Sequence, residues 1–284
     1  MTFAQAILLA ILQGVSELFP VSSLGHAVLV PALLRWSIDR ASPTFLAFIV
    51  VLHLGTAVAL LIYYRREWYA IIRAMIGSIV RGKLSGEPSE HLGWLLVVGS
   101  VPVGILGVFL ERAMRALLGA PITVAIFLTC NGFIMFLGEH LRNRQLAGGR
   151  TYKTLDEIGW REAVFVGFSQ ALALFPGISR SGSSIVAGLL VDLNHLQAAR
   201  FAFLLATPII GAAGLLEIPE LFAPGVELTL VESIVGGILA AITAYLSVAF
   251  LERYFKTNDL RPFGWYSLAA GVACIVIFST GVLK

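Results

Sequence analysis

Charged residues are scarce in this sequence. Asp, Glu, Lys and Arg together make up 13% of the 284 residues, whereas hydrophobic residues make up 58%. Soluble domains carry about 25% charged residues, so the composition excludes an ordinary soluble protein. The formal net charge of +3 is small and is concentrated in a few loops, which suits membrane orientation better than nucleic-acid binding. We therefore expect an integral membrane protein with bilayer lipids as partners and no nucleic-acid partner.

Three further features are missing. The two cysteines, Cys130 and Cys274, both lie in apolar runs, which gives neither a disulfide framework nor metal-ligand spacing. No long polar linker divides the chain, so we expect a single membrane domain over residues 1–284. Residues 1–12 are apolar but lack the basic region and cleavage site of a secretory signal, so we expect them in the mature fold.

Apolar runs long enough to cross a bilayer are abundant. A spanning helix needs about 20 apolar residues, and six runs meet that length: 43–64, 92–110, 121–139, 198–218, 231–251 and 264–283. Two further apolar regions, 2–36 and 160–195, are interrupted by Phe-Pro, serine and glycine. Irregular backbone at membrane depth is tolerated only where protein or water covers it. The sequence thus predicts an all-α polytopic membrane protein with six transmembrane helices and two re-entrant helical hairpins.

The two halves of the chain repeat one order of elements. One sequence offset relates Phe19-Pro20 to Phe175-Pro176, and Gly14-x-x-Glu17 is echoed by Gly167-x-x-Gln170. Each half contains a hairpin followed by three spans, and an odd number of crossings places the second half upside down. Such inverted repeats with broken helices are a known membrane architecture. We expect repeat one over about residues 1–140 and repeat two over about 157–284.

Loop charges predict the orientation. Loops 65–91, 140–161 and 252–262 are rich in Lys and Arg, whereas loop 217–229 has three glutamates and no basic residue. Because cytoplasmic loops are the basic ones, both termini are expected outside, with Arg112 and Arg115 as a mild exception. Residues 66–80 predict an amphipathic helix along the inner surface with Trp68 and Tyr69 at the headgroups; a plain loop is the alternative.

Each interrupted region carries polar groups that a lipid-facing helix would not hold. These groups lie in residues 13–26 and 167–184. Proline disfavours helical geometry in the preceding residue, and the serines that follow can cap a new helix. We expect new helices to begin near Ser22–Ser23 and near Ser179–Ser184, each presenting free N–H groups, which form a ready anion site. If the two interruptions face each other, the shared pocket suits a diphosphate.

Arg180 and Glu17 are the ionisable residues of these stretches. A guanidinium at membrane depth is costly unless it meets an anion, and its donor fork matches phosphate oxygens; an ion pair with Glu17 is the structural alternative, and the two roles are compatible. Gln13 lies one helical turn before Glu17. We expect both to ligate a divalent cation, Mg²⁺ or Ca²⁺, although Gln13 could instead be a packing amide.

Ser23 and His26 are three residues apart and share a helix face. His26 could take the Ser23 proton or protonate a leaving phosphate. Ser22 and Ser181 are expected mainly as helix caps, with a structural role for Ser23 and His26 as the alternative. His53 lies alone within a span, where helix–helix hydrogen bonding is favoured over chemistry.

These two stretches together resemble the undecaprenyl-pyrophosphate phosphatase family, also called the bacitracin-resistance family. The first stretch is similar to that family's glutamate-rich motif leading into PVSS-x-GH, and the second to its PG-x-SRSG motif; the matching residues are Gln13, Glu17, Pro20, Val21, Ser22, Ser23, Gly25 and His26, and Pro176, Gly177, Ser179, Arg180, Ser181 and Gly182. Gln13 departs from the glutamate that is common there, and Ser184 stands where threonine is usual. The resemblance covers essentially the whole chain.

The resemblance implies a bacterial inner-membrane enzyme that hydrolyses undecaprenyl diphosphate to undecaprenyl phosphate and inorganic phosphate, recycling the lipid carrier for peptidoglycan synthesis. It also implies dependence on a divalent cation and a site that opens to the periplasmic side. It gives Glu17, Ser23, His26 and Arg180 catalytic places, and it places Gln13, Ser22, Ser179, Ser181, Gly182 and Ser184 at the substrate. A homodimer is an open alternative to a monomer.

Two alternatives remain at this point. Ser23 or a water molecule could attack the terminal phosphorus, with His26 handling the proton. A secondary transporter or flippase for an anionic solute or lipid phosphate would also have inverted repeats and broken helices. Such a transporter would need Arg180 and the helix ends, but not a serine–histidine pair beside a carboxylate.

Overall fold

A computed structural model describes residues 1–39, 42–117, 120–222, 225–226 and 229–280, with the backbone alone for residues 111–117 and 220. The long helices are α3 (Pro43–Tyr63), α4 (Arg65–Arg81), α5 (Pro88–Leu117), α6 (Pro121–Ala147), α9 (His195–Glu217), α10 (Leu230–Tyr254) and α11 (Arg261–Ser279). The shorter helices are α1 (Phe3–Ser16), α2 (Ser23–Leu33), η1 (Leu155–Glu157), α7 (Trp160–Ser169), η2 (Gln170–Leu174), α8 (Arg180–Leu190) and η3 (Ile218–Phe222).

Six helices among the described residues are long and apolar enough to cross a membrane, namely α3, α5, α6, α9, α10 and α11. They coincide with the six runs predicted from the sequence within about four residues at each end, except that α5 and α6 continue seven and eight residues beyond the predicted C-terminal ends. The protein is therefore an all-α polytopic membrane protein. Helix α4 is the long helix outside this set, because its charged residues lower its hydropathy.

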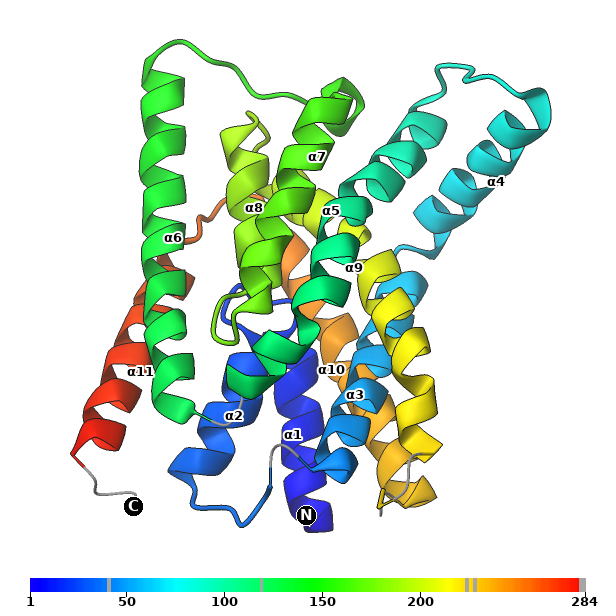
Figure 1. The fold of residues 1–284 in the computed structure, drawn as a ribbon. Helices are drawn as coiled ribbons and strands as arrows, with labels where there is room; N and C mark the ends of the chain where they lie inside the picture. The colour runs from blue at the N-terminus through cyan, green and yellow to red at the C-terminus, as the bar shows by residue number, and fades with distance from the viewer. Residues whose placement is uncertain (40–41, 118–119, 223–224, 227–228, 281–284) are drawn as a thin grey trace.

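Both interrupted regions form helical hairpins. Helices α1 and α2 enter from one end of the bundle, whereas α7 and α8 enter from the opposite end, and the turns of the two hairpins meet in the middle (Figure 1). We call the connection at residues 17–22 the first tip and the connection at residues 175–179 the second tip. Neither hairpin runs through to the far side of the bundle, in agreement with the predicted re-entrant segments.

Two glycines seat the hairpins against the opposite half of the chain. A Cβ added to Gly14 on α1 would lie 2.0 Å from the Oγ1 of Thr243 on α10, and one added to Gly167 on α7 would lie 2.1 Å from the carbonyl oxygen of Gly99 on α5. Small residues allow such close helix contacts in membranes. The echo of Gly14 in Gly167 thus has a packing reason, and this reciprocal packing is what an inverted repeat predicts.

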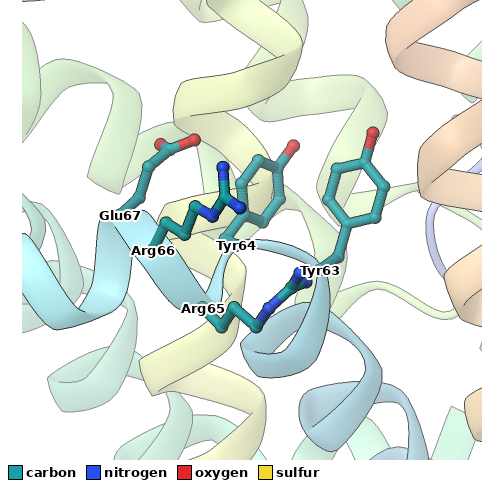
Figure 2. A pocket seen from close by; sticks show the side chains of 5 residues that line it. All are labelled: Tyr63, Tyr64, Arg65, Arg66 and Glu67. Carbon is teal, nitrogen blue, oxygen red and sulfur yellow. The ribbon is translucent and has the colours of Figure 1, made fainter.

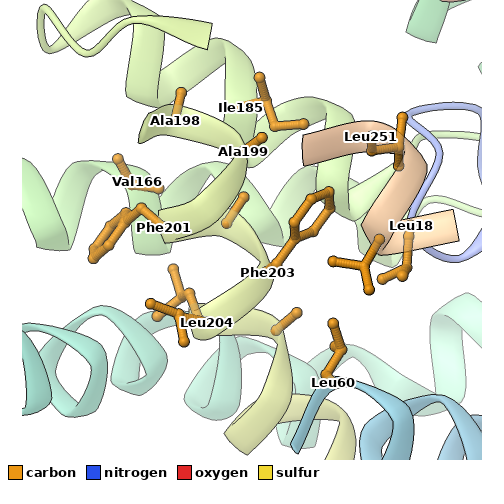
Figure 3. Packing of buried hydrophobic residues seen from close by; sticks show 14 of the residues in the cluster. Leu18, Leu60, Val166, Ile185, Ala198, Ala199, Phe201, Phe203, Leu204 and Leu251 are labelled. Carbon is orange, nitrogen blue, oxygen red and sulfur yellow. The ribbon is translucent and has the colours of Figure 1, made fainter. Parts of the chain in front are cut away.

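The largest hydrophobic cluster surrounds α9. Phe201, Phe203 and Leu204 on this helix are fully buried, and Figure 3 shows Phe203 directed toward Leu18 of the first tip and Leu251 of α10. Because lipid tails are as apolar as leucine, these contacts stabilise the fold through close packing rather than through exclusion of water. The first tip is therefore anchored in the protein core by Leu18.

Helix α4 confirms the helix expected at residues 66–80, but it is not isolated. It packs against α5, where the Trp94 Nε1 donates to the Ser78 hydroxyl at 3.0 Å, and Arg81 pairs with Glu90 at 2.6 Å. Tyr69 is exposed, as expected for a headgroup position, whereas Trp68 packs against the large cluster. The side chains of Arg112 and Arg115 lie outside the described residues.

Candidate active site

The first tip begins where α1 ends and finishes at a strained serine. Ser22 has φ 68° and ψ 101°, a region that residues other than glycine rarely adopt, and its hydroxyl accepts the Gly25 N–H at 3.2 Å. Ser22 is therefore the N-cap of α2, as the sequence predicts. Such strain persists only where surrounding contacts hold it and is concentrated at functional sites.

The second tip repeats this arrangement without the strained serine. Ser179 caps α8 by accepting the Gly182 N–H at 3.1 Å, with an ordinary extended backbone. The unusual backbone falls on Gly177 instead, at φ 118°, and a Cβ there would lie 2.4 Å from the Val124 carbonyl oxygen of α6. Only glycine fits this position without a shift of the backbone.

Asn131 of α6 joins the two tips. Its Nδ2 donates to the Pro20 carbonyl at 3.0 Å, and its Oδ1 accepts the Ser179 N–H at 3.0 Å. The same Nδ2 also lies 3.1 Å from the hydroxyl of Ser267 on α11. The two tips are also bonded to each other directly, since the Ser181 hydroxyl donates to the Phe19 carbonyl at 3.2 Å. The two helix starts are thus held against each other by hydrogen bonds among buried groups.

An ion pair crosses between the tips. The Arg180 Nη2 lies 2.8 Å from the Glu17 Oε1, and the two side chains are only 13% and 6% exposed. This is the structural pairing that the sequence left open beside phosphate binding. The Glu17 Oε2 accepts from the Gln13 Nε2 at 3.0 Å and from the Ser23 hydroxyl, and it lies 3.5 Å from the His53 Nε2. Burial of both charges is tolerable because each is paired and hydrogen-bonded.

Two buried polar atoms beside this ion pair have no hydrogen-bond partner among the described residues. They are the Arg180 Nη1, a cationic donor, and the Gln13 Oε1, a neutral acceptor. An unpaired polar atom in the interior is costly, so each is available to a ligand of complementary charge. Arg180 can therefore bind an anion, and Gln13 can bind a cation.

The residues present fit a hard divalent cation. Glu17 and Gln13 supply carboxylate and amide oxygens, the ligand types that Mg²⁺ and Ca²⁺ prefer. Among the described residues, no group of three or more His, Cys, Asp or Glu side chains is placed to hold a metal. The protein would then supply few ligands, an arrangement typical of Mg²⁺ sites that are completed by water and substrate phosphates.

His26 does not pair with Ser23 as the sequence suggested. The His26 Nδ1 lies 2.7 Å from the Ser22 carbonyl oxygen, and its Nε2 lies 2.7 Å from the Tyr266 hydroxyl. The Ser23 hydroxyl instead donates to Glu17. The reason is local: Ser23 is the first residue of α2 and faces the end of α1, whereas His26 lies one turn further along and faces α11.

The remaining serines of the motifs bond mainly to backbone. The Ser184 hydroxyl donates to the Arg180 carbonyl at 2.8 Å, and the hydroxyls of Ser179 and Ser181 lie 3.0 Å apart. Ser22 caps α2, as expected. The expectation that Ser181 is a cap was wrong, because the N-cap of α8 is Ser179 and Ser181 lies within the helix, where its hydroxyl bonds to Ser179 and to the Phe19 carbonyl. Contact of Ser179, Ser184 and Gly182 with a substrate stays a prediction.

The sequence did not predict that three further residues contact this site. His53 is expected to bond between helices, and its Nε2 does lie 3.5 Å from the Glu17 Oε2 at the end of α1, while its Nδ1 bonds within its own helix to the Ile49 carbonyl at 2.9 Å; the sequence did not indicate that this partner is the carboxylate of the site. Asn131 and Tyr266 lie on spanning helices far from either motif. A buried amide within an apolar run was the available signal for Asn131; nothing in the sequence pointed to Tyr266.

A separate cavity of about 340 Å³ lies where α3 meets α4 and is lined by residues 63–67 (Figure 2). The hydroxyls of Tyr63 and Tyr64 donate to Glu252 of α10 at 2.9 and 2.8 Å. These bonds connect α3 to α10, and none of the residues that surround Glu17 lines the cavity. The cavity is therefore separate from the candidate site between the two tips.

Fold and site together define a polytopic membrane protein with a buried polar centre between two opposed helical hairpins. A family model described as Bacitracin resistance protein BacA matches residues 6–273, and the chain belongs to this family. It is 47% identical to Undecaprenyl-diphosphatase 2 of Chromobacterium violaceum, over 96% of this chain and 97% of that protein. It is also 44% identical to Undecaprenyl-diphosphatase of Acidiphilium cryptum, over 99% and 100% of the two chains.

Proposed function

We propose that this protein hydrolyses undecaprenyl diphosphate to undecaprenyl phosphate and inorganic phosphate, and so recycles the lipid carrier for peptidoglycan synthesis. The names of its relatives support this substrate. The observation that carries the proposal is the buried Glu17–Arg180 pair, in which the Arg180 Nη1 has no partner among the described residues. A guanidinium with a free donor beside two sets of helix N–H groups is suited to a diphosphate.

Each residue of the site has a distinct role in this reaction. Arg180 and the N–H groups of α2 and α8 bind the phosphate oxygens and stabilise the charge that develops on them. Glu17 orients Ser23, whose hydroxyl donates to the carboxylate and thereby directs a lone pair of its oxygen away from Glu17. Ser23 attacks the terminal phosphorus while its proton passes to Glu17, to which the hydroxyl is already bonded; the bond to the lipid phosphate breaks, and water then hydrolyses the phosphoserine to release inorganic phosphate. In the alternative route, water attacks the terminal phosphorus directly. In either route, His26 accepts a proton of the attacking water at its Nε2.

Glu17 and Gln13 would hold a divalent cation, Mg²⁺ or Ca²⁺, and such an ion would neutralise phosphate charge when bound. We expect EDTA to abolish phosphate release and either cation to restore it. Restoration by neither cation would contradict this part of the proposal.

The polyisoprenyl chain lies among the spanning helices within the bilayer. From the basic loops we place both termini and the opening of the site on the periplasmic side of the bacterial inner membrane. Cysteine residues introduced near the N-terminus, at Thr2, should then react with a membrane-impermeant maleimide in intact spheroplasts. Labelling only after lysis would reverse this orientation.

The test of the activity is phosphate release from undecaprenyl diphosphate by purified protein in detergent. Because detergent abolishes compartments, a transporter or flippase gives no signal. Arg180→Ala should lower kcat/KM at least about 100-fold, the scale of losing a transition-state donor. Arg200→Ala is the matched control, since it removes another partly buried arginine, paired with Glu67 at 2.9 Å, far from the tips. Wild-type protein that releases no phosphate would overturn the proposal.

A separate experiment distinguishes attack by Ser23 from attack by water. Labelled phosphate trapped on the wild-type protein and lost in Ser23→Ala supports a phosphoserine. An active Ser23→Ala enzyme excludes the covalent route and leaves attack by water.

A further inference from the structure

Tyr266 contacts His26 from a helix that neither motif includes. Its hydroxyl lies 2.7 Å from the His26 Nε2, and the two rings stack with centroids 5.7 Å apart and planes within 10°. The imidazole is buried, at 6% exposure, whereas Tyr266 is 47% exposed. Tyr266 therefore stands between the histidine and the outside of the helical bundle.

The hydrogen-bond pattern fixes the tautomer of His26. The Ser22 carbonyl can only accept, so the Nδ1 at 2.7 Å from it must carry a hydrogen. In the neutral ring the Nε2 is then an acceptor, and the Tyr266 hydroxyl is its donor. Because Nδ1 is bonded to backbone, Nε2 is the nitrogen left for proton transfer.

The position of Tyr266 is itself fixed by the structure. Its neighbour Ser267 lies 3.1 Å from the Asn131 Nδ2, and Asn131 bonds to both tips. On the same side of α11, Gly264 approaches Gly132 of α6 so closely that a Cβ on Gly132 would lie 2.7 Å from the Gly264 carbonyl. Helix α11 is therefore locked in register with the tips, and the phenol is held over the imidazole.

We propose that Tyr266 is a positioning residue for His26, an inference that rests on the proposed function: its hydroxyl holds the imidazole with a hydrogen on Nδ1 and a lone pair on Nε2. For Nε2 to take up a proton from the attacking water, the phenol O–H first turns away toward water or a phosphate oxygen and frees the lone pair of Nε2. The new Nε2–H then donates to the phenol oxygen, so the hydrogen bond is reversed. The phenol O–H bond does not break, so Tyr266 supports both protonation states of His26.

The first test is Tyr266→Phe, which keeps the stacked ring and removes the hydroxyl. We expect kcat to fall about tenfold, the scale of one hydrogen bond, with KM unchanged within about twofold. Tyr245→Phe on α10 is the control, because its ring packs on Tyr63 with centroids 5.4 Å apart, away from the tips. Wild-type kcat in Tyr266→Phe would overturn the proposal.

A double-mutant cycle separates positioning from general packing. In a His26→Ala background, adding Tyr266→Phe should change kcat by less than about twofold, since the hydroxyl acts through the imidazole. A further fall equal to that seen in the wild-type background would show that Tyr266 acts independently of His26, and it would contradict the inference.

A spectroscopic readout does not depend on turnover. In protein carrying ¹⁵N-histidine, the unprotonated ring nitrogen of His26 can be assigned by its loss in His26→Ala. This resonance should move in Tyr266→Phe and stay in place in Tyr245→Phe. An unmoved resonance refutes the contact, even if the wild-type protein proves inactive on lipid diphosphates; a moved one supports the positioning role whatever the substrate.

Discussion

The two hairpin tips have the same framework and different chemistry. Each follows a Phe-Pro break, and in each a serine caps the new helix by accepting the N–H three residues ahead. In the glycine motif before the break, however, the first hairpin has Glu17, three residues before Pro20, and the second has Gln170, six residues before Pro176. Glu17 bonds to side chains from both hairpins, whereas the Oε1 and Nε2 of Gln170 have no partner among the described residues, although Gln170 is only 1% exposed.

The difference shows that a repeated framework need not repeat its function. The two helix starts contribute similar N–H groups, but the carboxylate comes from one hairpin and the guanidinium from the other. Opposite charges placed this way attract the tips to each other, whereas two carboxylates would repel. The framework brings the two tips together, and the asymmetry of its side chains places a guanidinium and a carboxylate beside the Ser23 hydroxyl. In the proposed function these groups are the phosphate site, the cation ligand and the nucleophile.

The largest effect on activity is expected from removing the negative charge of Glu17 in the first hairpin. Glu17→Gln gives both hairpins a glutamine, deprives Arg180 of its counter-charge and leaves one acceptor oxygen where two carboxylate oxygens served Arg180 and Ser23. Phosphate release should fall at least about 100-fold, because residues that act as a unit lose most of their effect together. Size-exclusion profiles should match wild type. An enzyme that keeps more than a tenth of its activity (about 1.4 kcal/mol) would show that the asymmetry is not needed.

Removing the link between the tips should have the next largest effect. Asn131→Leu leaves the Pro20 carbonyl and the Ser179 N–H without their partner, each at a cost of about 1–3 kcal/mol. The detergent-solubilised protein should therefore melt at a lower temperature and lose activity. Thr129→Val, two residues away on α6 with a hydroxyl bonded to its own helix at the Ala125 carbonyl, is the control. Equal melting temperatures for the two variants would contradict the linking role.

The two hairpins should lose similar amounts of stability when their packing glycines are replaced by alanine. Gly14→Ala and Gly167→Ala place a methyl group about 2 Å from α10 and α5, and each should destabilise the protein by about 1–3 kcal/mol. Gly104→Ala on α5 is the control, since a Cβ there meets nothing within 4 Å. If one hairpin tolerates the methyl and the other does not, the two halves do not share one mode of packing.

The smallest effect is expected at Gln170. Gln170→Leu replaces a buried amide that lacks partners with an apolar group of similar size, which can be nearly neutral or stabilising. Activity should stay within about threefold of wild type, and the melting temperature should hold or rise. A large loss of activity would assign Gln170 a role in the site and so remove the contrast with Glu17.

The transmembrane helices and the interruptions in the hairpins could be predicted from the sequence, because each depends on a short stretch of chain. Apolar length identifies the six crossing helices, Phe-Pro predicts the interruptions at Pro20 and Pro176, and serine predicts the cap at Ser22. At the second break the serines placed the helix start only within residues 179–184, and the structure assigns the cap to Ser179. The cost of burying Arg180 also required a nearby anion, and the structure supplies Glu17. Each of these inferences depends on one stretch of chain and the energy of placing it in a bilayer.

Only the tertiary structure decided which side chains meet. The sequence spacing of Ser23 and His26 suggested a pair, but Ser23 bonds to Glu17 and His26 to Tyr266, since these partners come from α1 and α11 and the strained backbone at Ser22 sets the direction of α2. Asn131 could not be placed because its partners lie more than forty residues away in sequence. A hydrogen bond depends on direction within a few ångströms, and helices that are distant in sequence determine that direction only when they pack.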